Sequence, residues 1–586
     1  MQAQSILKLP YASYIAMGGS LILGLTLKDP LTHSWNYCFS NSSPTEKPHQ
    51  LAKHKTYDQT SINKLFAQAD ALFHENNVDE AIKQYKQILL KDNSSILALI
   101  RLGAALCKKE NYELAEFYYR TAVSLHPGFI LSYIKLGLVQ HRLKKYTDAL
   151  RTFAAVIALQ PNNFEAHFNA SKVYSDLQNF ERAIAHAKKA IEMQPQNVHT
   201  HLNLGHIYNK QGDTQSAVKM YEKAIEVEPE LANAHYNLGY TLRVQREPKK
   251  ALPHLFRALE LQPEYPDAHI ALAQSYWTLG DFKTAWKHYN WRWKQLGIDP
   301  KTLDIPLWDG SPLNGKKILL YAEQGMGDTL QFIRYAKLVK NLGGYVICKT
   351  QKPLDTILQS CPYIDKLARK LDANTQPDVQ APLLNLPGIL NTTAETIPHP
   401  IPYLFADKKL SAQWKQKLAS DKNFKIGLAW HVLPEHENNK SPISRRSIPL
   451  KLLAPLADVK GISFYSLQKF DGVEQVLELP ENFNVKTFGH DFDESNGRFM
   501  DTAALIDNLD LIISVDTSII HLAAGMGKNV WTFLPYSPDC RWDLNENTTP
   551  WYQTMRLFRQ QTVGDWESVI TRIKTALEKE VSKPIA

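Results

Sequence analysis

Gly325, Gly327 and Asp328 lie where an apolar segment ends, within residues 321–335 (YAEQGMGDTLQFIRY), and could form a nucleotide-binding turn between a strand and a helix. The two glycines would let a ligand approach the backbone closely. The run Asp-Thr-Leu-Gln that begins at Asp328 is also typical of a capping box, in which Gln331 bonds back to the cap amide. The alternatives are therefore a ligand-binding loop and a plain strand-to-helix turn.

Two common nucleotide-binding motifs do not fit this stretch. In the dinucleotide fingerprint, Leu330 occupies the position of the third glycine, and the next expected strand ends in Lys-Thr at 349–350 instead of an acid for the ribose. A P-loop would need a Gly-Lys-Ser/Thr sequence, and none follows. The sequence therefore argues against an oxidoreductase and against a nucleoside triphosphatase.

A second group, Asp516, Thr517, Ser518 and His521, begins a predicted helix directly after a strand. The free N–H groups and the dipole of a helix N-terminus attract anions, so this group could hold a phosphate or a ribose. His521 lies one turn into the helix, on the same face as Thr517. The alternative is structural, with Asp516 as a helix cap and His521 as a packed side chain.

Arg445 and Arg446 follow Lys440 in a polar loop, and arginine suits bidentate phosphate contacts. The alternative is an exposed, solvated run of charge. The string Asp491-Phe492-Asp493 is expected to be an exposed loop and not a metal site. The five cysteines are widely scattered without a CxxC pair, which predicts free thiols and no zinc site.

The elements that position these groups alternate between strands and helices after residue 304, an order that predicts parallel sheets. Two doubly wound halves, residues 305–400 and 401–586, would leave a cleft at the carboxyl ends of their strands. The passage 377–404 between them is expected to be irregular. We expect strands at 316–322, 345–350, 424–430, 462–467, 511–515 and 530–534, and helices at 329–341, 354–360, 502–508, 517–525 and 563–579.

Residues 62–299 repeat with a period of 34, which predicts stacked pairs of antiparallel helices. The pattern resembles the tetratricopeptide repeat, in seven copies. Alanines mark every copy, at Ala81, Ala115, Ala149, Ala183, Ala217, Ala251 and Ala285, and prolines that end the second helix recur at Pro127, Pro161, Pro195, Pro229 and Pro263. Histidines at the same step are expected to pack, because neighbouring repeats lie too far apart to share a metal: His167, His201, His235 and His269.

Asn169, Asn203 and Asn237 occupy one position in three successive repeats. Such an asparagine ladder can hydrogen-bond an extended peptide whatever its side chains. A similar ladder lines the groove of the repeat-bearing O-GlcNAc transferases, and this resemblance implies peptide binding. The alternative is that each asparagine bonds within its own helix pair.

Residues 305–580 resemble the heptosyltransferase-type (family 9) glycosyltransferases, in particular bacterial proteins that fuse such a domain to tetratricopeptide repeats. The resemblance implies an all-α tetratricopeptide solenoid followed by an α/β two-Rossmann domain, the B-type glycosyltransferase fold. It rests on EQGMGDTLQFIRY (323–335), IGLAWH (426–431) with RRSIPL (445–450), DLIISVDTSIIHLAAGMGKNVWTFLP (510–535) and PWYQTMRLFRQ (550–560).

This resemblance implies a nucleotide sugar as co-substrate, with no cofactor and no metal, and Asp328 as the general base. It also implies a donor site made of Gln324, Gly325, Gly327, Arg445, Arg446, Asp516, Thr517, Ser518 and His521. The sequence Thr-Ser-Ile-Ile-His at 517–521 departs from the more usual glycine-containing start of this helix, so the identity of the donor stays open.

The first 61 residues suggest a membrane contact. Residues 1–33 contain an uncharged apolar run at 9–27, which can just span a bilayer, and 34–61 read as a linker. The run could be an inner-membrane anchor, a cleaved signal or a buried segment. The net charge of +8 is too diffuse to indicate nucleic acid. Nucleotide sugars and free thiols favour a cytoplasmic active site.

The sequence thus predicts a glycosyltransferase that modifies a polypeptide recruited by the repeats. Two alternatives remain: transfer to a lipid-linked or lipopolysaccharide glycan, with the repeats docking a partner, and an inactive repeat scaffold.

Overall fold

The structure, a computed structural model, describes residues 59–298, 304–371, 376–399, 401–434, 437, 441–489, 491–542 and 547–582. These residues form two compact units, 59–230 and 231–582. No helix within the described ranges is long and apolar enough to cross a membrane, and the predicted apolar run at 9–27 lies outside them.

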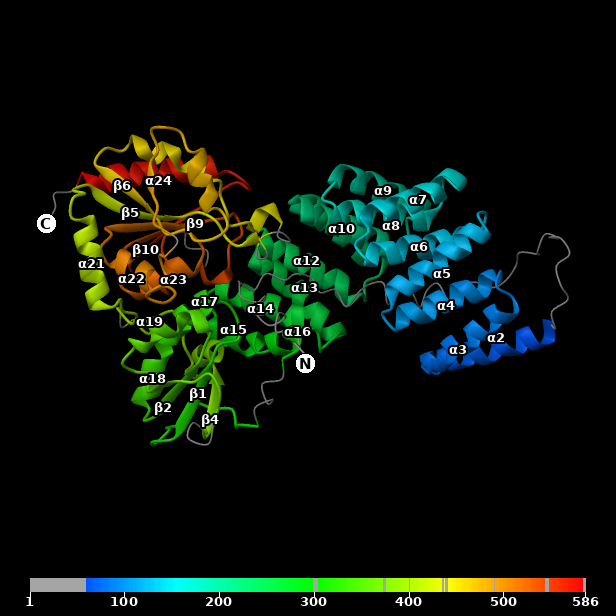
Figure 1. The fold of residues 1–586 in the computed structure, drawn as a ribbon, viewed down its shortest axis with the longest axis horizontal. Coiled ribbons are helices and arrows are strands. Elements are labelled where there is room, and N and C mark those ends of the chain that lie inside the picture. The colour runs from blue at the N-terminus through cyan, green and yellow to red at the C-terminus, as the bar shows by residue number, and fades with distance from the viewer. Residues whose placement is uncertain are drawn as a thin grey trace, which may run out of the picture. The chain divides into compact units, whose positions relative to one another are not determined.

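The unit of residues 59–230 consists of helices that pack in successive pairs (Figure 1). The first helix of each pair contacts the second, and the second contacts the first helix of the next pair. The pairs are α2 (Gln59–His74) and α3 (Val78–Lys91), α4 (Ile96–Lys108) and α5 (Tyr112–Leu125), α6 (Ile130–Arg142) and α7 (Tyr146–Leu159), α8 (Phe164–Asp176) and α9 (Phe180–Met193), and α10 (Val198–Gln211) and α11 (Thr214–Val227).

Small residues let the helices of a pair approach closely, as the period of 34 predicts. A side chain on Gly137 would place its Cβ 2.6 Å from the ring of Phe153, and one on Gly205 would lie 2.6 Å from the ring of Tyr221. The seven alanines that mark the repeats have 0% exposure throughout both units: Ala81, Ala115, Ala149, Ala183, Ala217, Ala251 and Ala285. The repeat pattern therefore comes from packing between the two helices of each pair.

The recurring histidines also have a structural role. His167 and His201 each donate from Nε2 to the carbonyl of the proline that follows the preceding helix pair, Pro161 at 3.0 Å and Pro195 at 2.8 Å. This hydrogen bond satisfies a carbonyl near a helix end. The expectation that these histidines pack within the repeats is confirmed for both.

The unit of residues 231–582 begins with five more helices. They are α12 (Ala232–Val244), α13 (Pro248–Leu261), α14 (Pro266–Thr278), α15 (Phe282–Tyr289) and α16 (Arg292–Leu296). The last of them are tied directly to the sheet region that follows. Trp286 Nε1 donates to the carbonyl of Thr392 at 3.2 Å, and buried Arg292 forms an ion pair with Glu323 at 2.6 Å.

A four-stranded parallel sheet follows, in the order β3-β2-β1-β4. Its strands are β1 (Lys317–Tyr321), β2 (Tyr345–Lys349), β3 (Lys366–Leu367) and β4 (Val379–Pro382), and its helices are α17 (Met326–Phe332), α18 (Ala336–Asn341), α19 (Asp355–Gln359) and α20 (Leu386–Ile389). Strand β4 pairs with β1, although the sequence analysis expected 377–404 to be irregular. That expectation was wrong. A strand of only four residues that ends in a proline is too short to show the pattern by which longer strands are recognised.

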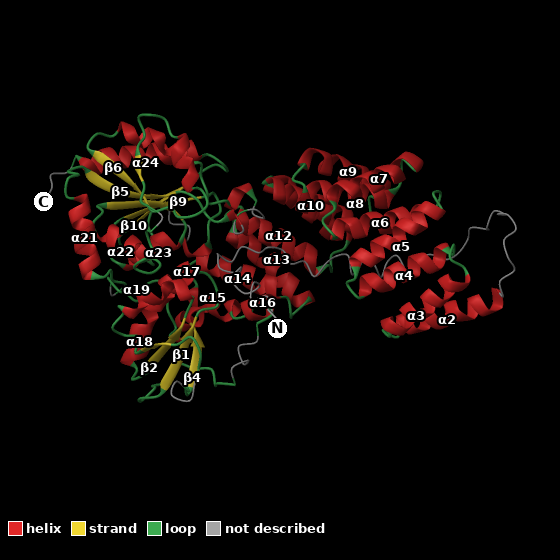
Figure 2. Cartoon of the chain, viewed as in Figure 1, coloured by secondary structure: helices red, strands yellow, loops and turns green. Residues whose placement is uncertain are grey.

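The second sheet (Figure 2) is also parallel. Its six strands have the order β10-β9-β8-β5-β6-β7. Its strands are β5 (Phe424–Ala429), β6 (Ile462–Ser466), β7 (Val485–Lys486), β8 (Leu511–Val515), β9 (Val530–Leu534) and β10 (Met555–Arg559). The principal helices are α21 (Lys408–Leu418), α22 (Met500–Asp507), α23 (Ser518–Gly525) and α24 (Trp566–Val581). The strands predicted in this region are confirmed to within one residue at each end, and β7 and β10 were not expected.

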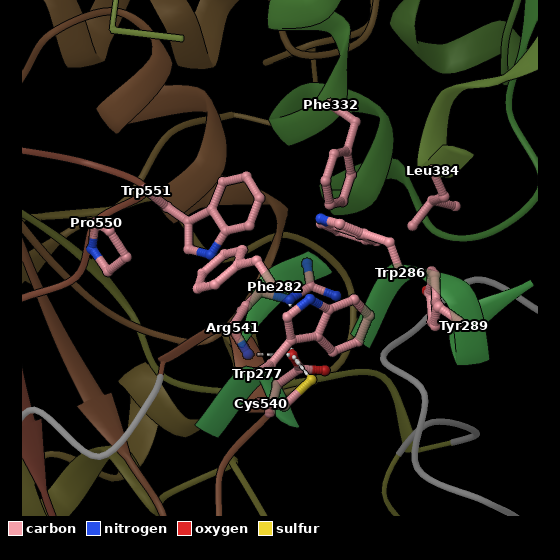
Figure 3. Close-up of a pocket in the computed structure, with 11 residues that line it drawn as sticks. Trp277, Phe282, Trp286, Tyr289, Phe332, Leu384, Cys540, Arg541, Pro550 and Trp551 are labelled. Atoms are coloured by element: carbon pink, nitrogen blue, oxygen red, sulfur yellow. Dashed lines mark hydrogen bonds and ion pairs between the residues drawn. The ribbon is translucent and has the colours of Figure 1, made fainter. Parts of the chain in front are cut away.

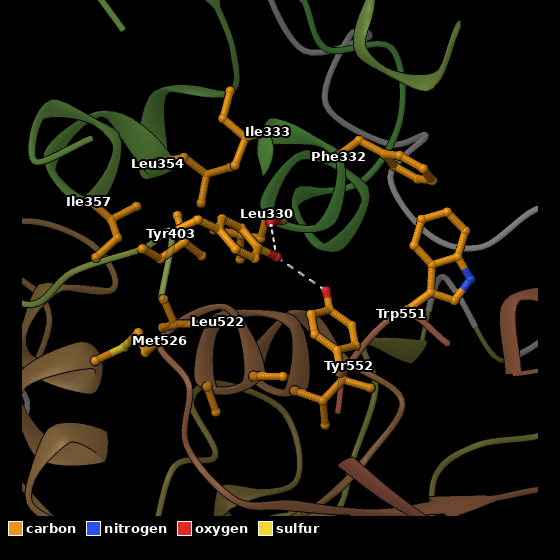
Figure 4. Close-up of a cluster of buried hydrophobic side chains, with 14 of the residues drawn as sticks. Leu330, Phe332, Ile333, Leu354, Ile357, Tyr403, Leu522, Met526, Trp551 and Tyr552 are labelled. Carbon is orange, nitrogen blue, oxygen red and sulfur yellow. Dashed lines mark hydrogen bonds between the residues drawn. The ribbon is translucent and has the colours of Figure 1, made fainter. Parts of the chain in front are cut away.

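The two sheets are joined through the helices that follow β1 and β8. Helix α17 packs directly on α23, and both contribute to one buried apolar cluster (Figure 4). Leu330 from α17 and Leu522 from α23 lie in this cluster, with Tyr403 between the elements. The carboxyl ends of the two sheets therefore meet at α17 and α23, where the sequence placed its candidate residues.

Candidate functional site

Asp328 lies in the first turn of α17 and not before it. The cap of the helix is Gly325, and Asp328 Oδ2 accepts a hydrogen bond from the Gly325 amide at 3.1 Å. The prediction that Asp328 caps the helix with Gln331 bonding back was therefore wrong, because the helix begins at Met326 despite the glycines. Only 5% of Asp328 is exposed.

Arg541 is the cation that neutralises Asp328, and the sequence analysis missed it. It lies in the short helix η8 (Cys540–Trp542). Its Nη2 donates to Asp328 Oδ1, its Nε to Asp539 Oδ1 and its Nη1 to Gln331 Oε1, each at 2.8 Å. Burial alone would raise the pKa of Asp539, but Arg541 holds it below its ordinary value. Arg541 thus links the first turn of α17 to the short helix η8, which lies between β9 and β10 of the six-stranded sheet in the sequence.

Asp516 lies beside this arginine without capping α23. The cap is Thr517, whose hydroxyl accepts from the Ile519 amide at 3.3 Å, so the predicted cap was wrong. Asp516 is 4% exposed, and its carboxyl accepts from Trp542 Nε1 at 2.9 Å. Burial raises the pKa of Asp516, and the neighbouring guanidinium groups of Arg446 and Arg541 oppose this rise.

His521 is a buried, neutral side chain between the two helices. It is 2% exposed, and its Nδ1 lies 2.9 Å from the hydroxyl of Tyr552. Burial, and then the charge of Arg541, lower the pKa of His521 well below its ordinary value. A side chain on Gly327 would place its Cβ 3.0 Å from His521 Cδ2. The space beside Gly327 is therefore filled by a neighbouring side chain, whereas the sequence analysis assigned it to an approaching ligand.

The two arginines of the 445–446 pair have different environments. Arg446 is buried, and its Nη1 donates to the backbone carbonyl of Asp516 at 2.9 Å, so it lies at the start of α23. Arg445 is exposed. Thr517 and Ser518 are half-buried, as is Gln324, so the first residues of α23 and the loop after β1 are partly exposed.

The three asparagines of the predicted ladder all bond within the chain. Asn169 Nδ2 donates to the Glu165 carbonyl at 2.8 Å, and Asn203 Nδ2 donates to Ser171 Oγ at 2.7 Å. In the other compact unit, Asn237 Nδ2 donates to Asn233 Oδ1 at 2.8 Å. The bonds of Asn169 and Asn237 lie within their own helices, as the structural alternative expects, whereas Asn203 bonds to a helix of the preceding pair. Peptide binding by the asparagines stays a prediction.

A pocket adjoins Arg541 on the side of the last repeat helices (Figure 3). Aromatic side chains form most of its wall, and the residues of η8 form a polar end. The lining consists of Trp277, Phe282, Trp286, Tyr289, Phe332, Leu384, Asp539, Cys540, Arg541, Pro550 and Trp551. This pocket was not predicted from the sequence, because its residues come from segments with no common motif.

Comparison with family models identifies the helical pairs. Models of the tetratricopeptide repeat match residues 66–128, 134–198, 186–219 and 232–265, and a further TPR repeat model matches 205–242. The chain carries tetratricopeptide repeats. This confirms the repeat resemblance and gives the chain a scaffold suited to protein interaction.

One curated relative and many solved structures are similar to the chain. Protein FlbA of Caulobacter vibrioides is 26% identical over 320 residues, which are 51% of this chain and 53% of the relative. The chain thus spans about half the length of this relative. A tetratricopeptide repeat protein from Parabacteroides merdae is 14% identical with a TM-score of 0.36, covering 42% of this chain and 96% of that protein. PilW, described as a type IV pilus biogenesis factor, is 17% identical with a TM-score of 0.34, covering 36% and 98%.

Proposed function

We propose that the chain is a glycosyltransferase that moves a sugar from a nucleotide diphosphate donor to a polypeptide acceptor. The observation that carries the proposal is the contact between α17 and α23, which follow strands of two different parallel sheets, with Arg541 bonded to Asp328 in the first turn of α17. Ligands of open parallel sheets bind at the carboxyl ends of the strands. The motifs shared with heptosyltransferase-type enzymes support the same assignment.

In this proposal the diphosphate binds at the start of α23. The free amides of Ser518 and the following residues, together with the helix dipole, attract an anion. Arg446 donates to the backbone at Asp516 and lies next to this helix end, so its guanidinium, which also forms an ion pair with buried Glu437 at 3.3 Å, is the proposed partner of the phosphates. Arg541 supplies a second positive charge, and its attraction to the diphosphate increases as the leaving group gains negative charge in the transition state.

Asp328 is the proposed general base. The acceptor hydroxyl attacks the anomeric carbon and a new carbon–oxygen bond forms. The bond from that carbon to the diphosphate breaks, and the hydroxyl proton passes to Asp328. The hydrogen bonds from Gly325 and Arg541 to the carboxylate fix its orientation before the acceptor arrives. Each carboxylate oxygen accepts one of these bonds and keeps a second lone pair, which can take the proton.

The repeats are proposed to recruit the acceptor. The active site is proposed to lie in the cytoplasm, with residues 9–27 as an anchor of the chain in the inner membrane. A glycan acceptor, with the repeats docking another protein, is the alternative within the same chemistry.

A second candidate function is an inactive scaffold. It is favoured by the burial of Asp328, Asp516 and His521, each at most 5% exposed, and by the filled space beside Gly327. In this case the charged cluster would only hold the two sheets together.

A donor screen separates these functions. The full chain is heated with UDP-, GDP- or ADP-linked sugars, with the matching nucleosides as controls that lack the diphosphate. One donor class should raise the unfolding temperature, since a ligand at 100 times its Kd stabilises a protein by about 2.7 kcal/mol. The nucleosides should have a much smaller effect. If no nucleotide sugar raises the unfolding temperature, the scaffold function is correct and the transferase proposal fails.

A further inference from the structure

Two arginines at the end of α12 lack an ion-pair partner among the residues that the structure describes. Arg243 lies in the last turn of the helix, and Arg246 follows the cap residue Gln245. The Nε atom of Arg243 is buried without a hydrogen-bond partner in the described ranges. Arg257 on the next helix differs, because its guanidinium pairs with Glu260 at 3.0 Å. The two positive charges at the end of α12 are therefore not neutralised by any described carboxylate.

Each of these guanidinium groups lies over the ring of a tyrosine. The Cζ atom of Arg243 is 5.1 Å from the ring centroid of Tyr240, and that of Arg246 is 5.7 Å from the ring centroid of Tyr536. The ring attracts the cation, but it offers no oxygen to the N–H donors, which can still bind an anion. Both arginines are half-buried, so an anion bound to them would be partly shielded from water.

The two arginines adjoin the loop that carries Arg541. Tyr536 lies in this loop, which leads from β9 to η8, and helix α14 packs both on α12 and on η8. Burial raises the pKa of the Cys540 thiol, and the charge of Arg243 is close enough to oppose that rise. Tyr536 precedes Arg541 by five residues, so the two lie at most about 18 Å apart. The arginines at the end of α12 are thus near the residue that bonds Asp328.

One face of α12 leads to these arginines and is polar. Asn233, Asn237 and Tyr240 precede Arg243 at spacings of three or four residues, so the four side chains lie along the same face, and all are half-buried. Amide and phenol groups can bond to a peptide backbone, and arginine suits a carboxylate. A nucleoside diphosphate could meet the arginines but has no backbone to follow this face. The arrangement therefore favours an extended polypeptide with an acidic residue.

We propose that Arg243 and Arg246 bind an acidic side chain of the polypeptide acceptor. The identification of this polypeptide as the acceptor rests on the proposed function, whereas the binding itself does not. The carboxylate accepts from N–H groups of both arginines, and the polypeptide backbone follows the polar face of α12. Because the adjoining loop leads to Arg541, a polypeptide bound in this way is held near Asp328, the proposed base.

The test is a calorimetric titration of the full chain, without any donor, using a short Gly-Ser peptide with a central pair of glutamates. We expect this peptide to bind at least about 5-fold more tightly than the same peptide with a pair of glutamines, because charge-assisted hydrogen bonds are lost in the second. The affinity for the glutamate peptide should fall as salt is added. Equal binding of the two peptides would overturn the proposal. Displacement of the glutamate peptide by a nucleoside diphosphate would also overturn it, because the arginines would then belong to the donor site.

Three variants locate the bound carboxylate. Arg243→Gln and Arg246→Gln should each weaken binding of the glutamate peptide at least about 5-fold and leave that of the glutamine peptide unchanged. Arg257→Gln is the matched control and should stay within about 2-fold, since Glu260 already neutralises this arginine. If one variant misfolds by circular dichroism, the other carries the test. Unchanged affinity for the glutamate peptide would contradict the proposal, and because no donor is present, that result would leave the transferase proposal standing.

Discussion

Asp328→Asn should lower the rate of sugar transfer by about 10²- to 10⁴-fold, the usual effect of removing a general base. The amide keeps the shape of the side chain, and its single oxygen can keep the bond from Arg541, but its NH2 group cannot accept from Gly325 and it cannot take up the acceptor proton. Donor binding, measured by thermal shift, should persist. The rate is to be measured as sugar incorporated into the acceptor at saturating donor.

Asp539→Asn is the matched control for this experiment. It removes the other carboxylate that Arg541 contacts, so it changes the local charge equally without touching the proposed base. Its transfer rate should stay within about 10-fold of the wild type. If the two variants lose activity equally, the effect comes from the charge cluster, and if Asp328→Asn transfers normally, Asp328 is not the base.

Arg541→Gln should destabilise the folded chain by about 3–5 kcal/mol, because breaking a buried ion pair leaves uncompensated charge. Asp328 and Asp539 would both lose their cation in a region almost without solvent. The measurement is the free energy of unfolding in guanidinium chloride, taken from the transition in which residues 231–582 unfold. Arg445→Gln, which removes an exposed arginine, should change stability by less than about 1 kcal/mol. A similar small change for Arg541→Gln would mean that the cluster is open to water.

The loss caused by Arg541→Gln should also depend on pH. In the wild type Arg541 holds the pKa of Asp539 below its ordinary value. The ionised Asp539 therefore stabilises the folded chain at pH values above its ordinary pKa, and this stabilisation is lost as the pH falls through the lowered pKa. In the variant without the arginine, burial raises the pKa of Asp539. Protonation of this carboxyl at low pH then removes the cost of a buried unpaired charge. The difference between the two proteins should therefore be largest near neutral pH and should narrow below about pH 5.

The repeats were predictable because their signal is local and periodic. An alanine every 34 residues lies where two helices touch, and each copy repeats the same requirement, so Ala81 and Ala285 occupy equivalent places that the sequence spacing already reveals. The strands β8 and β9 were predictable for a related reason. They are buried on both faces and are therefore continuous apolar runs.

The site was only partly predictable, because its contacts join distant segments. Asp328 and Arg541 are 213 residues apart, and neither position carries a motif that points to the other. Gly327 was assigned to a ligand because loop glycines often face one, but its neighbour is His521 of α23, the helix that follows β8. The aromatic pocket was missed for the same reason, since α14, α15, α17 and the segment before β10 meet only in the folded chain.

Titration of the donor nucleoside diphosphate into wild type and Ser518→Glu tests the central claim most directly, because Ser518 is the first residue of α23. A negative charge at this position interacts favourably with the helix dipole, so the stability of the folded chain should be unchanged or slightly higher. The same charge repels the diphosphate and should weaken its binding by about 100-fold or more. Ser518→Gln, of similar size without the charge, should retain most of the affinity. Equal affinity for wild type and Ser518→Glu would contradict the account, because the diphosphate would then bind away from the start of α23.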